Sequence, residues 1–214
     1  MAVSKWSNVA VAIGTLGSAQ VISAISKANP GVMTYVGTDP ANGDYLALTD
    51  VLGMSQVNSR ILRGANVNTG GNTIELESED TSSYDTFTSG NMQPVTFSTT
   101  MSVAAGVSVS GGDFDFLDTT TIHDAVRTQI PGLASPTVFT FDCFWDPADA
   151  ALTALKSASD NQAIRALRIT FANGKKFLLL GYVGCSLTPT GNAQETVKTA
   201  VVFTAFGRPT TYAT

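Results

Sequence analysis

The feature that most constrains this chain is a hydrophobic pattern with a period of two, which recurs over much of its length. In VTFSTTMSV (residues 95–103) the apolar side chains fall on one side of an extended strand and the hydroxyl side chains on the other. The apolar set is Val95, Phe97, Met101 and Val103, and the hydroxyl set is Thr96, Ser98, Thr100 and Ser102. The pattern predicts a strand with one buried and one polar face.

The same alternation continues toward the C-terminus and indicates antiparallel pairing. Residues 137–145, 168–171 and 196–206 each read as a strand, and turn residues separate them. Asn173-Gly174 lies between two such runs and predicts a tight hairpin with a type I′ turn, in which both central residues have positive φ. We therefore expect a mainly β fold.

One helix interrupts the strands. Asp146-Pro147 is typical of a helix start, with Asp as N-cap and Pro at the first helical position. Small and aliphatic residues then recur at helical spacing, which predicts a helix over about residues 147–158 that packs on a sheet. Residues 18–28 carry a weaker helical spacing and fit a strand equally well.

The chain also shows a change of composition near residue 92. Residues 30–92 are dense in turn signals with short apolar runs between them, which indicates a small all-β unit of its own. Residues 111–135 hold few strand signals and are expected to form a long loop. Loops of that length in compact domains usually have a function.

Composition and charge exclude several classes of protein. Only 14% of the residues are charged, against roughly 25% in an average soluble domain. The net charge is −5 and the bases are scattered, whereas a nucleic-acid reader needs clustered Lys and Arg. We expect no signal peptide, no membrane span, and two free buried thiols at Cys143 and Cys185.

The residues that could carry chemistry do not form a recognisable site. His123 is the single histidine and is interpreted as a loop residue, without partners at metal-ligand spacing. Asp113, Asp115 and Asp118 lack the spacing of a calcium loop and are expected to face solvent or a neighbouring subunit. The acidic residues Glu75, Glu77 and Glu79 could be an acid–base pair but are interpreted as the solvated face of a strand. We expect no enzyme, no metal and no cofactor.

The C-terminal half resembles a known family. Four features occur in order: FTFDCFWDP before the helix, RALRITFANGKKFLLLGYVG, the turn-rich SLTPTGNAQ, and ETVKTAVVFTAFGRPT. Together they are similar to the tail tube protein of lambda-like phages with long, flexible tails, over about residues 93–214. Residues 20–92 resemble a small β-barrel module of phage tail and baseplate proteins, here inserted after the first strand.

The resemblance implies a fold, a role and a set of partners. The fold is a tail-tube β-sandwich with one flanking helix, built from residues 1–19 and 93–214, with the inserted module of residues 20–92 on the exterior. Six copies would form a ring, and stacked rings would form a hollow tube that delivers DNA. Partners would be further copies, a tape measure protein, a tail terminator and distal tail or baseplate proteins; the location would be the virion, after synthesis in the host cytoplasm.

The resemblance also implies roles for individual residues. The loop from residue 118 to 132 corresponds to one that contacts neighbouring subunits and rings, and its candidates are Asp118, Thr119, Ile122, Val126, Arg127, Ile130 and Pro131. Thr96, Ser98, Thr100 and Ser102 are candidates for the lumen wall, although that face could equally meet solvent or the inserted module. The remaining alternatives are another ring-forming tail component and a surface-binding β-sandwich.

Overall fold

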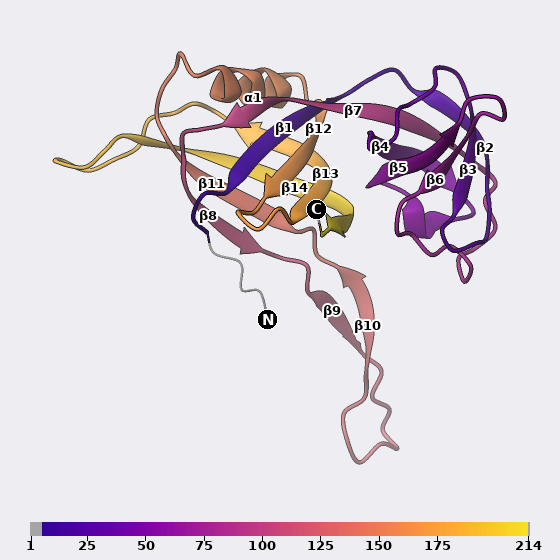
Figure 1. Ribbon diagram of the computed structural model, residues 1–214. Helices are drawn as coiled ribbons and strands as arrows, with labels where there is room; N and C mark the ends of the chain where they lie inside the picture. The colour runs from indigo at the N-terminus through magenta and orange to yellow at the C-terminus, as the bar shows by residue number, and fades with distance from the viewer. Residues whose placement is uncertain (1–5, 214) are drawn as a thin grey trace.

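A computed structural model describes residues 6–213, and within them the chain is almost entirely β-structure with one α-helix (Figure 1). Residues 1–5 of the predicted first segment lie outside the described residues. The strands are β1 (Ala10–Leu16), β2 (Gln20–Ile25), β3 (Val32–Val36), β4 (Tyr45–Leu52), β5 (Arg60–Asn68), β6 (Thr73–Leu76), β7 (Ser89–Met101), β8 (Ala104–Ser110), β9 (Phe114–Asp118), β10 (Gln129–Ala134), β11 (Val138–Phe144), β12 (Ile164–Thr170), β13 (Lys176–Cys185) and β14 (Lys198–Tyr212). The helix is α1 (Ala150–Asp160), and Ser55–Val57 form a 3-10 turn.

Six strands close into a small barrel in the order β2-β3-β6-β5-β4-β7, because β7 also pairs with β2. Inward side chains such as Met33, Leu46, Leu62 and Ile74 are fully buried and form a core of their own. Closure leaves the barrel without a free sheet edge around its girth. Residues 18–28, which fitted either a helix or a strand, contain β2.

The other strands form a larger sheet in the order β7-β1-β12-β13-β14-β11-β8, which we call the large sheet. It curls around a second core that includes Phe141, Leu167 and Phe203. Helix α1 covers this core and packs mainly on β13 (Figure 1). The helix begins three residues later than predicted: Asp149 is the N-cap, and its side chain accepts a hydrogen bond from the Leu152 N–H at 2.9 Å.

Strand β7 belongs both to the barrel and to the large sheet, and the face that carries its buried side chains changes along its length. Its first half pairs with β2 and β4 of the barrel, and its second half pairs with β1 of the large sheet. The β1–β7 register shifts between Ile13 and Thr15, as at a β-bulge. Val95 accordingly belongs to the core against the barrel, whereas Met101 belongs to the core under α1. The single apolar face predicted for residues 95–103 is wrong.

A third core joins the barrel to the outer face of the large sheet. Ala47 and Ile61 come from the barrel, and Leu178, Leu180 and Tyr212 come from β13 and β14. The backbone N–H of Arg63 also donates a hydrogen bond to the Tyr212 hydroxyl oxygen at 2.7 Å. The barrel is therefore packed against the sheet and not only tethered to it. The division into two domains at residues 19/20 and 92/93 stays a prediction, and the second of these positions falls inside β7.

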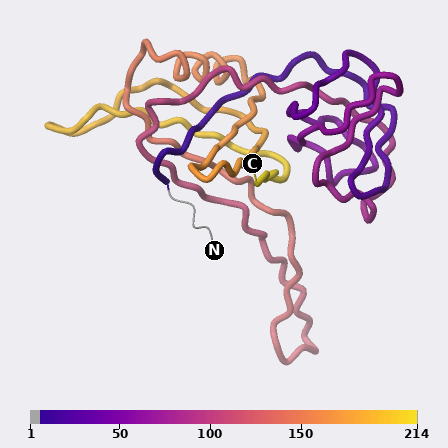
Figure 2. Tube along the Cα trace, viewed as in Figure 1, coloured from indigo at the N-terminus to yellow at the C-terminus, as the bar shows by residue number. Residues whose placement is uncertain are grey.

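Two local predictions need correction. Residues 111–135 are not an irregular loop but a β-hairpin, β9–β10, that extends away from the large sheet (Figure 2). The β12–β13 turn lies at the predicted place but is not type I′, because only Gly174 of the Asn173-Gly174 pair has positive φ. The Phe171 N–H bonds to the Lys175 carbonyl, which leaves a three-residue loop with glycine at its left-handed position.

Candidate assembly surfaces

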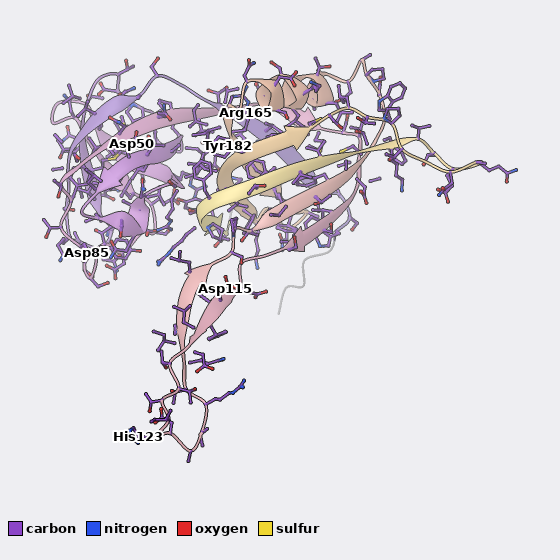
Figure 3. All side chains as sticks on the ribbon, turned by 180° about the vertical axis from the view of Figure 1, so that it is seen from behind. Asp50, Asp85, Asp115, His123, Arg165 and Tyr182 are labelled. Carbon is purple, nitrogen blue, oxygen red and sulfur yellow. The ribbon has the colours of Figure 1, made fainter. Side chains whose placement is uncertain are left out.

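The β9–β10 hairpin, residues 111–135, is the most exposed element of the molecule, and we call it the hairpin arm. Among the described strands, β9 and β10 pair only with each other. All five residues of β9 are exposed to solvent, as are five of the six of β10. In Figure 3, Asp115 lies near the base of the arm and His123 at its tip, far from the rest of the chain. His123 is a loop residue, as predicted.

Local hydrogen bonds shape the tip of the arm. The Asp118 carboxylate accepts from the Thr120 N–H at 2.8 Å, and the Asp124 carboxylate accepts from the Thr121 N–H at 2.7 Å. These bonds lower the pKa of both carboxyl groups, for Asp118 through its bonds from Thr120 and for Asp124 through its bonds from Thr121. The tip is therefore a built turn with negative charge on its surface.

The base of the arm depends on a glycine. Gly111 has φ +79°, and a Cβ atom there would lie 2.1 Å from the Pro136 carbonyl oxygen. No larger residue fits at this position, because the two segments at the base of the arm approach each other too closely. The direction in which the arm leaves the large sheet is thus set by the backbone at its root.

Many side chains along the arm are both apolar and exposed, which a protein that remains a monomer would not need. Ile122 is 97% exposed, Leu133 87% and Phe116 63%, and Phe114, Leu117, Val126 and Ile130 are also exposed. All the residues predicted for intersubunit contact lie on the arm in exposed positions: Asp118, Thr119, Ile122, Val126, Arg127, Ile130 and Pro131. Adjacent exposed apolar side chains of this kind mark an interaction surface. Their contact with a neighbour stays a prediction.

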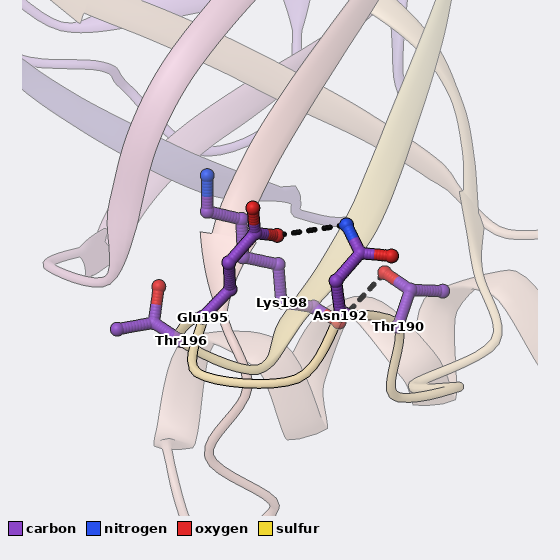
Figure 4. A pocket seen from close by; sticks show the side chains of 6 residues that line it. Thr190, Asn192, Glu195, Thr196 and Lys198 are labelled. Atoms are coloured by element: carbon purple, nitrogen blue, oxygen red, sulfur yellow. Dashed lines mark hydrogen bonds between the residues drawn. The ribbon is translucent and has the colours of Figure 1, made fainter.

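A second projecting segment is the loop between β13 and β14, residues 186–197. A bridge between Thr190 and Lys198 closes it, and the Asn192 amide donates to the Glu195 carboxylate at 2.9 Å (Figure 4). These residues line a polar, open hollow of about 500 Å³. It holds neither a buried charge nor an enclosed apolar wall, so its geometry offers no ligand site.

The large sheet has two free edges. The outer edge of β8 has no partner strand among the described residues, and β7 loses its β4 partner beyond Val95. Between β1, the end of β7 and the start of β8 lies a groove of about 580 Å³, lined by residues that include Val11, Met101 and Phe141. Unpaired edges of this length are a template for pairing with another chain.

The polar side chains predicted for a lumen wall are exposed, but they do not share one face. Thr96 follows Val95, and Thr100 precedes Met101. Because neighbours in a strand alternate and Val95 and Met101 point to opposite cores, Thr96 and Thr100 point to opposite sides of the sheet. Ser98 and Ser102 are exposed as well. Whether any of the four lines a lumen stays a prediction.

The acidic residues after β6 are structural. The strand ends at Leu76, and the Glu79 carboxylate is buried, where it pairs with Arg60 and accepts from the Tyr84 hydroxyl at 2.6 Å. The predicted solvated face is therefore wrong for Glu79. Glu77 pairs with Arg63, and this hydrogen bond is the main cause that lowers the Glu77 pKa.

No metal centre emerges from residues 6–213. The described part of the chain has no cluster of three or more His, Cys, Asp or Glu side chains that could hold a metal ion. Cys143 and Cys185 are buried free thiols, and burial raises the pKa of Cys143 to about 11. None of the helices in this range has the length and apolar character needed to cross a membrane.

Comparison with known proteins decides the family. The sequence matches the family described as phage tail tube protein, TTP, over residues 52–214, which is well over half of the chain. The chain belongs to the phage tail tube protein family. The match begins at the end of β4 and so includes part of the barrel, although the sequence resemblance covered only about residues 93–214.

Membership of this family places the protein in the virion tail as a structural component. Tail tube proteins assemble with copies of themselves into a tube and associate with other tail components. No curated protein matches the sequence. The exposed arm and the free sheet edges are the candidate surfaces for contact between copies of the chain.

Proposed function

We propose that six copies of this chain form a ring, and that stacked rings form the hollow tube through which phage DNA reaches the host cell. The hairpin arm is the observation that carries this proposal. Among the described strands, β9 and β10 pair only with each other, and an element that exposes Phe116, Ile122 and Leu133 has no core of its own in which to bury them. Burial against a neighbour would remove this apolar surface from water.

The sheet edges support a ring in particular. The outer edge of β8 and the outer edge of β7 are different surfaces of the same chain, so contacts between them are heterologous. Heterologous contacts generate a closed ring when the rotation between copies closes. Pairing of these edges around the ring would also satisfy backbone groups that are otherwise open to unwanted pairing.

We propose that the barrel lies on the exterior of the tube and that exposed hydroxyl side chains on one side of the large sheet, with Thr96 or Thr100 among them, line the lumen. The barrel packs on one face of the large sheet through Ile61, Leu180 and Tyr212, which occupies that region of the face. In the lumen, hydroxyl side chains and few bases would let the phosphate backbone pass without being held. The tape measure protein, tail terminator and distal tail or baseplate proteins are the proposed partners at the two ends of the tube.

Negative-stain electron microscopy with sedimentation tests the proposal. The wild-type protein should form six-fold rings or hollow tubes, alone or with the tail-tip complex of the same phage. A variant with Phe116→Ser, Ile122→Ser and Leu133→Ser should remain monomeric but folded. The matched control replaces exposed apolar residues of the barrel, with Val21→Ser, Val36→Ser and Leu52→Ser, and should assemble like the wild type.

Two results would contradict the proposal. A wild-type protein that stays monomeric even with the tail-tip complex would favour a surface-binding module over a tube. Tubes that form equally well from the arm variant would show that the arm is not an assembly surface.

A further inference from the structure

Charge is unevenly distributed along the chain. Residues 20–92 hold eight carboxylates and three basic side chains, and the hairpin arm, residues 111–135, holds four carboxylates and one arginine. The remaining residues hold five carboxylates and eight basic side chains. The arm therefore carries a net charge of −3, and the body from which it projects carries +2 over its described residues, with Lys5 lying outside them. Such segregation favours contact between the arm of one copy and the body of another.

A definite part of that body combines positive charge with one exposed and two half-buried aromatic rings. The β12–β13 turn presents Lys175 and Lys176, and Phe171 and Phe177 lie at the strand ends beside them. Trp6 packs edge-on against Phe171, with ring centroids 5.5 Å apart, and remains 59% exposed. We call these five residues the basic–aromatic surface.

Part of the basic–aromatic surface is concave. Lys175, Lys176, Phe171 and Phe177 line a cavity of about 490 Å³ that also touches Tyr212. None of the residues between 6 and 213 that line it is acidic. Trp6 continues the surface into the groove beside β8, so the hollow adjoins a free sheet edge.

The cations of this surface are not neutralised within the chain. Among residues 6–213, neither lysine ammonium forms a salt bridge or a hydrogen bond, although the field of Lys176 helps to lower the pKa of Glu77. A pair of adjacent unpaired lysines beside the exposed Trp6 ring and the half-buried rings of Phe171 and Phe177 suits a ligand that is both acidic and apolar.

The hairpin arm has that character. Phe114 and Phe116 are exposed and alternate with Asp113 and Asp115. Within the described part of the chain, the two carboxylates have no hydrogen-bond or ion-pair partner, whereas Asp118 and Asp124 are engaged in the turn at the tip. The base of the arm thus offers two free negative charges next to two exposed rings.

We propose that the basic–aromatic surface is the socket for the hairpin arm of a second copy. Asp113 and Asp115 of one copy would meet Lys175 and Lys176 of the other, while the arm's aromatic rings would pack beside Trp6 and Phe171. The chain's own arm extends away from the body and forms no ion pair with these lysines in the structure (Figure 2). This inference rests on the proposed tube, because it specifies one of its contacts.

Charge reversal in the full-length protein tests the socket. Lys175→Glu with Lys176→Glu should raise the critical concentration for assembly roughly tenfold or more, because like charges would face each other across the contact. Asp113→Lys with Asp115→Lys should do the same. A chain that carries all four substitutions restores opposite charges and should assemble near the wild-type concentration. Circular dichroism should show that every variant is folded.

Matched controls carry the same change of charge elsewhere. Asp50→Lys with Asp85→Lys reverses two exposed barrel carboxylates that lie far from the arm (Figure 3), and Lys27→Glu with Arg208→Glu reverses two exposed cations outside the surface. Neither pair should shift the critical concentration by more than about twofold, since exposed surface charges outside the contact contribute little to it, although Asp50 and Asp85 accept hydrogen bonds from Asn91 and Gln56 within the barrel. Added salt should weaken assembly of the wild type and of the four-substitution chain alike.

The outcomes separate the two proposals. Failure of the wild type to assemble, even with the tail-tip complex, would overturn both the tube and the socket. Tubes that form regardless of the lysine reversal, or single reversals that are not rescued in the four-substitution chain, would overturn the socket alone. A loss of assembly with the barrel pair Asp50 and Asp85, but not with the arm pair, would make the barrel the acidic partner.

Discussion

Tyr212 offers a quantitative test of how firmly the barrel is attached to the large sheet. Its side chain is 6% exposed and belongs to the core that joins the two units. Its hydroxyl oxygen accepts the hydrogen bond from the Arg63 N–H, and the Arg63 guanidinium lies 4.6 Å from the centre of its ring. Replacement of this one side chain therefore removes three kinds of contact at once.

The expected losses can be worked out from these contacts. Tyr212→Ala should lower the free energy of unfolding by about 3 to 5 kcal/mol, as for other buried aromatic side chains. Tyr212→Phe keeps the ring and leaves the Arg63 N–H without its acceptor, which should cost about 1 to 2 kcal/mol. Tyr182→Phe is the control, since Tyr182 is 49% exposed and should change stability by less than about 0.5 kcal/mol.

The pH dependence of the free energy of unfolding gives an independent test of the role of Tyr212. Burial is the main cause that raises the pKa of Tyr212 to about 12, against about 10 for an unfolded tyrosine. The neutral phenol is thus favoured in the folded state, and its contribution is fully present below pH 10. It is lost as the pH rises toward 12, by about 2 to 3 kcal/mol. Because this loss exceeds the 1 to 2 kcal/mol by which the wild type is the more stable protein below pH 10, the stability difference between wild type and Tyr212→Phe should fall to zero and change sign as the pH approaches 12.

Equilibrium unfolding in urea measures both effects, with limited proteolysis to detect a detached barrel. We expect a single transition for the wild type and a separate, earlier transition of one unit for Tyr212→Ala. A loss below about 1 kcal/mol for Tyr212→Ala, or an alkaline profile identical to that of Tyr212→Phe, would refute the reasoning that this core couples the two units.

Three further predictions concern single sites. Glu79→Gln should destabilise the protein by about 3 to 5 kcal/mol in thermal or urea unfolding because it leaves the buried Arg60 charge unpaired. The double change Glu79→Leu with Arg60→Met should cost less, about 1 to 2 kcal/mol, because only the half-buried Tyr84 hydroxyl then loses its acceptor. Gly207→Ala should cost more than Gly43→Ala by about 1 to 3 kcal/mol: both glycines have positive φ, but a Cβ at Gly207 would lie 2.2 Å from a barrel carbonyl oxygen, and nothing lies within 4 Å at Gly43. Cys143, buried and with its pKa raised to about 11, should resist alkylation near neutral pH in the folded protein and react in urea, as counted by mass spectrometry.

The local patterns in the sequence predicted most of the strands and the helix, because alternation and helical spacing are properties of neighbouring residues. These predictions failed at positions where the burial of a side chain depends on a partner that is distant in the sequence. The exchange of faces in β7 depends on its pairing with β1, where Gly14 lies close to Val95 and Phe97. The burial of Glu79 depends on Arg60, nineteen positions away, so its alternating neighbours suggested a solvated face.

The candidate assembly surfaces could also be predicted only in part from the sequence. The apolar and acidic residues of the arm were visible in the sequence, but their arrangement as a hairpin was not, since short alternating runs such as residues 114–118 resemble loop sequence. The basic–aromatic surface could not be predicted either. It brings Trp6 next to Phe171, and only the pairing of β1 with β12 places those two segments together.

The continuity of β7 has a mechanical consequence. This strand runs without interruption from the barrel into the large sheet, and its hydrogen bonds to β1 and β4 lie across its length. A force that pulls the barrel along this strand would load those bonds together in shear and not one after another. In the proposed tube, an external load on the barrel would therefore be transmitted directly to the strands of the large sheet.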